Sequence, residues 1–99
     1  MKDTLTVEQA VGRLLDDENA NWSYQGAHAL VEYLMDYERD TGQEMECDPV
    51  SFRCEFSEYK SYEDAADDYG VEEDEDPERY FGDNTTVIEF DGGVIIQAF

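Results

Sequence analysis

Residues 86–99 decide the fold class, and they read Thr86-Val87-Ile88-Glu89-Phe90-Asp91-Gly92-Gly93-Val94-Ile95-Ile96-Gln97-Ala98-Phe99. Apolar and β-branched side chains lie on both sides of an Asp-Gly-Gly segment. Glycine can adopt the positive φ angles that a tight turn between two strands requires. The stretch therefore predicts a C-terminal β-hairpin with strands at 86–90 and 94–99.

A third strand is predicted upstream of the hairpin, at residues 50–56. After Pro49 apolar side chains alternate with polar ones, namely Val50, Phe52, Cys54 and Phe56 with Ser51, Arg53 and Glu55. A period of two is typical of a strand with one buried face. We interpret Cys47 and Cys54 as two buried thiols rather than as a disulfide or a metal-binding pair.

Two helices are predicted before this strand. Thr6 and Gln9 match a capping box, and apolar residues at three- and four-residue spacing follow until about residue 17. A second apolar stripe runs from about Ser23 to Asp40, and Gly42 is placed to end that helix.

One short helix and one acidic loop are predicted between strand 50–56 and the hairpin. Ser61-Tyr62-Glu63-Asp64 resembles an N-terminal cap, and Gly70 can end the helix after about two turns. Residues 72–78 contain no large apolar side chain, so we expect an exposed, self-repelling loop.

The element order predicts an α+β fold in a single domain, residues 1–99. We expect the two N-terminal helices to pack on one face of a small, mainly antiparallel three-stranded sheet. The orientation of strand 50–56 stays open, because its connection to the hairpin is long enough for either direction.

The charge balance excludes several classes of ligand. The chain of 99 residues has 27 Asp or Glu and 6 Lys or Arg, a formal net charge of −21. Direct binding to nucleic acid or to an anionic membrane needs a basic face, which six cations cannot supply. Because 40% of the residues are apolar and 13% aromatic, we expect a folded core inside an acidic shell.

Targeting signals are not evident. No apolar run approaches the ~20 residues of a membrane span, and Met1-Lys2-Asp3-Thr4 lacks the apolar core of a signal peptide. We therefore expect a cytoplasmic protein.

Few residues suit catalysis. His28 lies beside the apolar stripe, which favours a hydrogen-bonded, partly buried side chain over a general base. Nucleophile-elbow and phosphate-loop motifs are missing from the sequence. The acids at 67–70 and 74–76 lack the spacing of an EF-hand loop. We expect no enzymatic activity, no cofactor and no structural metal site.

The distribution of acids points to candidate partner-binding residues. Half of the residues from Glu55 to Glu78 are acidic, and Lys60 is the one basic residue among them. A second row of acids lies on the outward face of the predicted helix 23–40, at four-residue spacing and without Lys partners. Like charges at that spacing destabilise a helix by a few tenths of a kcal/mol per pair, so such a row suggests a function. The candidates are Asp64, Asp67, Asp68, Glu72, Glu73, Asp74, Glu75 and Asp76, with Glu32, Asp36 and Asp40 as the second row.

The size of the charge favours imitation of nucleic acid over solubility alone. A globule of this length has a radius of gyration of about 13 Å, hence a diameter of roughly 33 Å. A DNA duplex of that length carries about 20 phosphate charges, close to the −21 of this chain. Solubility needs a net charge of magnitude about 2–8.

Three stretches of the chain are distinctive, namely Asp40-Thr41-Gly42-Gln43-Glu44-Met45-Glu46-Cys47-Asp48-Pro49-Val50-Ser51-Phe52-Arg53-Cys54-Glu55-Phe56-Ser57-Glu58-Tyr59, Ser61-Tyr62-Glu63-Asp64-Ala65-Ala66 and Thr86-Val87-Ile88-Glu89-Phe90-Asp91-Gly92-Gly93-Val94-Ile95-Ile96. With them, residues 24–99 resemble a group of small acidic phage and prophage proteins. Phages carry acidic DNA-mimic inhibitors of host defence, and the charge pattern is similar to these anti-restriction and anti-CRISPR proteins.

The resemblance implies a phage-encoded inhibitor in the host bacterial cytoplasm, bound to a basic, nucleic-acid-binding host protein such as a CRISPR effector or a restriction complex. The alternative is a phage structural or regulatory interaction module, anchored on a basic protein by exposed aromatic side chains. Its candidate anchors are Tyr59, Tyr62, Tyr69, Tyr80 and Phe81, but we expect most of them to complete a small core.

Overall fold

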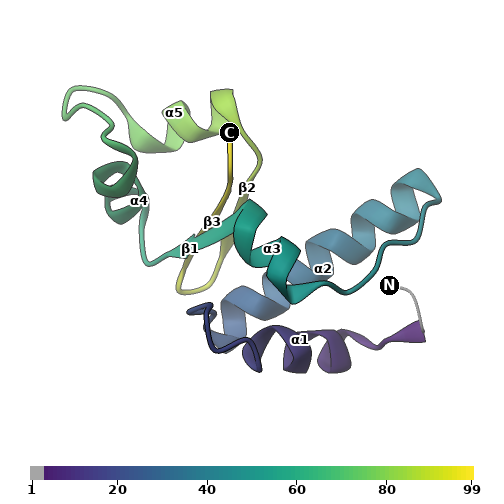
Figure 1. The fold of residues 1–99 in the computed structure, drawn as a ribbon. Coiled ribbons are helices and arrows are strands. Elements are labelled where there is room, and N and C mark those ends of the chain that lie inside the picture. The colour runs from purple at the N-terminus through teal and green to yellow at the C-terminus, as the bar shows by residue number, and fades with distance from the viewer. Residues whose placement is uncertain (1–3) are drawn as a thin grey trace.

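A computed structural model describes residues 4–99, which form five helices and one three-stranded antiparallel sheet (Figure 1). The helices are α1 (Val7–Leu15), α2 (Tyr24–Thr41), α3 (Pro49–Glu55), α4 (Tyr62–Tyr69) and α5 (Pro77–Asn84). The strands are β1 (Phe56–Tyr59), β2 (Val87–Phe90) and β3 (Gly93–Gln97). The α+β class is confirmed. The targeting argument from Met1-Lys2-Asp3 lies outside the described residues.

The two N-terminal helices begin and end where the capping residues predict. The Thr6 hydroxyl accepts the Gln9 N–H at 3.2 Å, and the Gln9 side chain accepts the Thr6 N–H at 2.9 Å. Ser23 caps α2 by accepting the Gly26 N–H, and Gly42 ends that helix at φ 72°. Local hydrogen bonds therefore fix both helices, as the sequence predicts.

The strand predicted at 50–56 is wrong, because residues 49–55 form α3. The Asp48 carboxylate accepts the Ser51 N–H at 3.3 Å, and Pro49 occupies the first helical turn. An Asp-Pro pair is a helix start signal, since proline has no N–H to lose there. Phe52 and Phe56, four residues apart, are both buried, whereas Val50 is 54% exposed. The strand β1 begins only at Phe56.

The same helix overturns the expectation of two buried thiols. Cys54 is exposed on α3, and Cys47 in the preceding segment is half-buried. Burial raises the pKa of the Cys47 thiol above its ordinary value.

The sheet has the order β1-β3-β2, with both pairs antiparallel. The predicted hairpin is confirmed: β2 and β3 pair across a turn at Asp91 and Gly92. On its other edge β3 pairs with β1, and there Gly93 lies so close to β1 that an added Cβ would be 2.4 Å from the Tyr59 carbonyl oxygen. The strand orientation left open by the sequence is therefore antiparallel.

Helices cover both faces of the sheet, not one (Figure 1). Ile95 of β3 belongs to a buried cluster with α1, α2 and α3, whereas its neighbours Val94 and Ile96 belong to a second cluster with α4 and α5. All three are at most 2% exposed. A strand buried on both faces carries a continuous apolar run, so the single-face arrangement is corrected to two helical layers. The helix α5 was not predicted, and it begins inside the stretch 72–78 that was expected to be a loop.

The molecule is elongated, with principal extents of 46 × 29 × 22 Å. The two helical layers lie at opposite ends of the long direction, with the sheet between them (Figure 1). Among residues 4–99, no helix combines the length and apolar character that crossing a membrane requires.

Candidate protein-binding surface

The helix α4 presents acids outward because its small residues face the sheet. Ser61 caps the helix by accepting the Asp64 N–H at 3.2 Å. Ala65 and Ala66 are buried against the sheet. The remaining face is acidic and exposed, and consists of Glu63, Asp64, Asp67 and Asp68.

A five-residue acidic segment, Glu72 to Asp76, follows α4 and is exposed throughout. It is attached at both ends. Gly70 ends α4 at φ 72°, and the next residue, Val71, packs into the cluster beneath. Asp76 caps α5 by accepting the Glu78 N–H at 3.2 Å. We call α4 together with the segment 72–76 the acidic end of the molecule.

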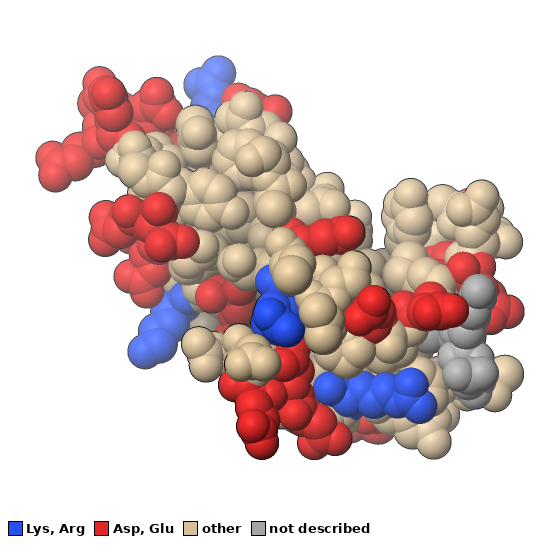
Figure 2. Space-filling view, viewed as in Figure 1, with Lys and Arg blue, Asp and Glu red and all other residues tan. Residues whose placement is uncertain are grey.

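The acidic end has few cations around it. Lys60, before α4, is exposed. Arg79 of α5 lies 3.8 Å from Asp83, and both side chains are mostly exposed. Figure 2 shows acidic side chains projecting from this end at the upper left. Because exposed ion pairs are weak, the local charge stays strongly negative.

Tyrosines beneath the acidic end hold two carboxylates. The Tyr59 hydroxyl donates to Asp68 at 2.6 Å, and the Tyr62 hydroxyl donates to Glu89 of β2 at 2.6 Å. Burial raises the pKa of both phenols above the ordinary value, and the neighbouring carboxylates raise it further. The first bond joins α4 to β1 and the second joins α4 to β2, so both hold the acidic end against the sheet.

Most of the aromatic residues considered as contact anchors complete a core. Phe81 is fully buried, so its assignment as an exposed anchor is wrong. Tyr59, Tyr62, Tyr69 and Tyr80 are partly buried and pack against the same cluster. The ring of Tyr69 stacks on the C-terminal Phe99, with ring centroids 5.4 Å apart, and Phe99 is 56% exposed.

Two members of the second acidic row, on α2, have side-chain partners on the same helix. His28 Nδ1 lies 2.6 Å from the Glu32 carboxylate, and Arg39 pairs with Asp36. Asp40 is exposed at the C-terminal end of the helix. The sequence showed no lysine at these spacings, but arginine and histidine supply the pairing instead. His28 is partly buried, as predicted.

The structure does not bring the two acidic groups together. The acidic end lies at one end of the long axis, and the C-terminal end of α2 lies at the other (Figure 1). Asp36 and Asp40, toward that end of α2, therefore lie apart from the acidic end, whereas Glu32, in the middle of the helix, lines a pocket with Glu89 and Asp91.

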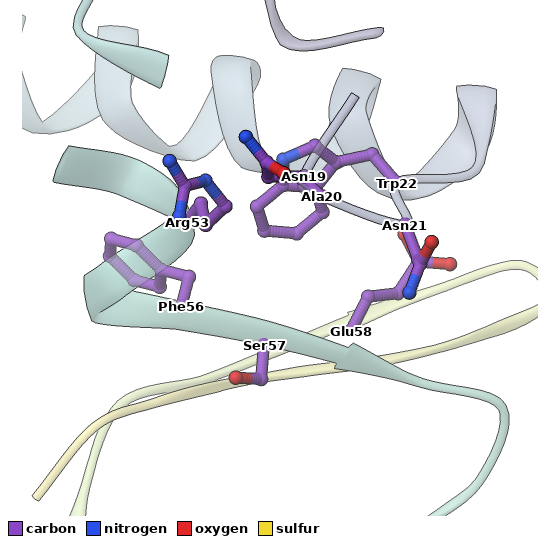
Figure 3. A pocket seen from close by; sticks show the side chains of 8 residues that line it. All are labelled: Asn19, Ala20, Asn21, Trp22, Arg53, Phe56, Ser57 and Glu58. Carbon is purple, nitrogen blue, oxygen red and sulfur yellow. The ribbon is translucent and has the colours of Figure 1, made fainter. Parts of the chain in front are cut away.

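A small polar pocket of about 190 Å³ lies between the α1–α2 connection, α3 and β1. Figure 3 shows the Trp22 ring between Arg53 and Glu58. Arg53 Nε donates to Asp17 at 2.9 Å, a bond that holds the pKa of Asp17 below its ordinary value. Glu58 accepts the Ser23 N–H at 2.9 Å. We assign these residues a structural role, because the first bond joins the end of α1 to α3 and the second joins the start of α2 to β1. The partners are 35 and 36 positions apart, so sequence patterns gave no signal for them.

Metal binding finds no support in the described part of the chain, where no group of three or more His, Cys, Asp or Glu side chains is placed to hold an ion. Comparisons with protein-family models, curated proteins and solved structures give no match.

Proposed function

We propose that the chain is a non-enzymatic acidic inhibitor that imitates nucleic-acid phosphates. It would occupy the basic nucleic-acid-binding channel of a host defence enzyme, such as a CRISPR effector or a restriction complex. The observation that carries this proposal is the acidic end, where exposed carboxylates of α4 and of the segment 72–76 follow one another at one tip of the molecule.

The dimensions agree with imitation of a short duplex. Over the 46 Å length of the molecule, DNA carries about 27 phosphate charges at one per ~1.7 Å. The chain carries a net charge of −21 over the same length. A basic channel that accepts the duplex would therefore meet a comparable charge density.

The acidic end suits a contact surface because it is anchored. Asp68 is held by Tyr59, and Asp76 is held as the cap of α5. A surface that is ordered before binding loses less conformational entropy when the partner arrives. The proposed contact residues are Asp64, Asp67, Asp68, Glu72, Glu73, Asp74, Glu75 and Asp76, with Glu32, Asp36 and Asp40 in a secondary role because Glu32 lies beside His28 and Asp36 pairs with Arg39.

Capture from a bacterial lysate tests the proposal. The immobilised chain is loaded at low salt and eluted with increasing NaCl, and each fraction is identified by mass spectrometry. We expect a DNA- or RNA-handling enzyme that elutes late, because phosphate-like contacts are steered and held by charge. Late elution of only virion or metabolic proteins would contradict mimicry.

A second candidate is an interaction module that binds a basic protein through an aromatic anchor. It is favoured by Phe99, which is 56% exposed and stacked on Tyr69 at the edge of the acidic layer. Under this alternative, Phe99→Ala abolishes binding of the captured protein without changing the melting temperature. Under mimicry the same substitution leaves the salt-dependent binding largely intact.

A further inference from the structure

A groove of about 630 Å³ opens on a different part of the surface from the acidic end. Its walls are the C-terminal half of α2, the segment before α3, α3 with the first residue of β1, Thr86 just before β2, and the end of β3. Figure 2 shows this region hollowed at the upper right, beside the end of α2. The segment before α3 is held there by Glu38, whose carboxylate accepts the Met45 N–H at 2.8 Å.

The base of the groove is apolar. Leu34, Phe52 and Phe56 line it and are at most 6% exposed, because their other sides belong to the main core. Met45 lies beside them. At the edge stands Tyr37, whose side chain is 52% exposed although the ring is large and mostly apolar. An apolar base with an exposed aromatic edge is typical of protein contact sites.

The rim of the groove is acidic. Glu46, Asp48 and Glu55 line it and are exposed, and no Lys, Arg or His is found among the described lining residues. Such a rim repels phosphates and also repels a second copy of this chain, whose net charge is −21. It attracts Lys and Arg.

We infer that the groove binds a basic segment of a partner protein, which inserts a leucine or an aromatic side chain against Leu34 and Phe52. Lysine or arginine residues on either side of that side chain contact Glu46, Asp48 and Glu55. The inference rests on the proposed function for the basic character of the partner. It adds a second contact on α2 and α3, where binding combines apolar burial with charge.

NMR titration of the ¹⁵N-labelled full chain tests the groove with two synthetic peptides. The first has one leucine and one tryptophan between two Lys-Arg pairs, and the second has serines in place of the leucine and tryptophan. We expect the first to shift the amide signals of residues 34–37, 45–48 and 97, and to bind about tenfold more tightly than the second.

Two substitutions on α2 provide a matched pair. Tyr37→Ala removes the exposed ring at the groove, and Tyr24→Ala removes a ring of nearly equal exposure, 51%, at the other end of the helix. Tyr37→Ala should weaken the leucine–tryptophan peptide about fivefold and leave the serine peptide unchanged. Tyr24→Ala should change neither. Circular dichroism establishes that both variants are folded.

The outcomes separate this inference from the proposed function. Equal binding of the two peptides, with shifts confined to residues 64–76, overturns the groove and leaves charge-based mimicry standing. Shifts in the groove that are insensitive to Tyr37→Ala also overturn it. Groove binding by the first peptide, with the captured host enzyme insensitive to neutralisation of residues 72–75, supports the groove while contradicting mimicry through the acidic end.

Discussion

The two helical layers are built on opposite principles. The layer of α1, α2 and α3 packs aliphatic side chains against one face of the sheet. Among them are Leu14, Leu30 and Val31, which are fully buried. The layer of α4 and α5 has small alanines and one buried phenylalanine, surrounded by partly buried tyrosines. The first layer supplies most of the apolar burial, and the second carries the densest charge.

The difference shows how a short chain can hold a strongly acidic surface. Tyrosine offers apolar area on its ring and a hydroxyl at its tip, so a thin layer can pack and bind carboxylates at once. Tyr59 and Tyr62 do this for Asp68 and Glu89. The central strand β3 contacts both layers, so their stabilities should be coupled.

The free energy of unfolding should fall most when the core of the α4–α5 layer, the thin layer, is emptied. Phe81→Ala should lower the free energy of unfolding by about 3–5 kcal/mol, because it empties the centre of the α4–α5 cluster. The single tryptophan, Trp22, packs against the other layer and reports its unfolding by fluorescence. If Phe81→Ala shifts the urea midpoint of the Trp22 fluorescence transition, the two layers are coupled through β3. An unchanged midpoint would mean that the layers unfold independently.

A smaller loss of stability is expected from a substitution in β3, the strand that contacts both layers. Gly93→Ala places a Cβ 2.4 Å from the Tyr59 carbonyl oxygen, so the β1–β3 pair must separate. We expect a loss of about 2 kcal/mol in thermal unfolding. Gly12→Ala is the matched control, because nothing lies within 4 Å of its added Cβ. Alanine in that helix should stabilise by about 0.5–1 kcal/mol. Similar destabilisation by both variants would contradict the close approach.

The tyrosine–carboxylate bonds should make the thin layer sensitive to alkaline pH. The folded state raises the pKa of Tyr59 and Tyr62 above the ordinary value of 10, so it favours the protonated phenols. Their contribution is full below pH 10 and is lost as the pH rises through the raised values. Tyr59→Phe should cost about 1 kcal/mol at neutral pH.

Urea unfolding at neutral pH and above pH 10 measures this dependence. The double variant Tyr59→Phe, Tyr62→Phe should lose less stability than the wild type over that interval. A Tyr37→Phe control, at an exposed ring in the other layer, should follow the wild type. Identical alkaline losses in all three proteins would count against the proposed role of the bonds.

The smallest effects distinguish the two acidic groups. Asp36→Asn removes the partner of Arg39 and should destabilise by a few tenths of a kcal/mol, as expected for an exposed pair. Asp74→Asn relieves repulsion among exposed acids and should stabilise by a similar amount. Both differences should shrink in 1 M NaCl, where the screening length is about 3 Å. Thermal unfolding at low salt tests this prediction, because the stability changes of Asp36→Asn and Asp74→Asn should have opposite signs.

Local signals predicted local structure well. Thr6, Ser23 and Ser61 each fix a helix start through a bond to a backbone amide three residues away. The error at residues 50–56 came from ranking alternation above the helix start signal at Asp48 and Pro49. That signal begins α3, in which Phe52 is buried, and the equally buried Phe56 is already the first residue of β1.

Long-range features were harder to predict. The apolar run Val94 to Ile96 did contain the signal for a strand buried on both faces, but its second helical layer depends on α5, which follows an acidic stretch. The acidic candidates are all exposed, yet the sequence could not show that α4 and the segment 72–76 lie at one end of the molecule and Asp40 at the other (Figure 1). The groove was not predicted, because its walls come from four separate segments.

We propose that the acidic end acts as a substitute for nucleic-acid phosphates. Two variants with equal charge change test it against the captured host enzyme bound to fluorescent DNA. One carries Glu72→Gln, Glu73→Gln, Asp74→Asn and Glu75→Gln, and keeps Asp76 as the cap of α5. The other carries Glu32→Gln, Asp36→Asn, Asp40→Asn and Glu44→Gln, along α2 and just beyond its C-terminal end.

DNA displacement at increasing ionic strength is the decisive measurement. We predict that the wild type displaces DNA, that displacement weakens with salt, and that the 72–75 variant is at least about tenfold weaker than the α2 variant. Displacement that is independent of salt, or equal for the wild type and the 72–75 variant, would contradict the claim.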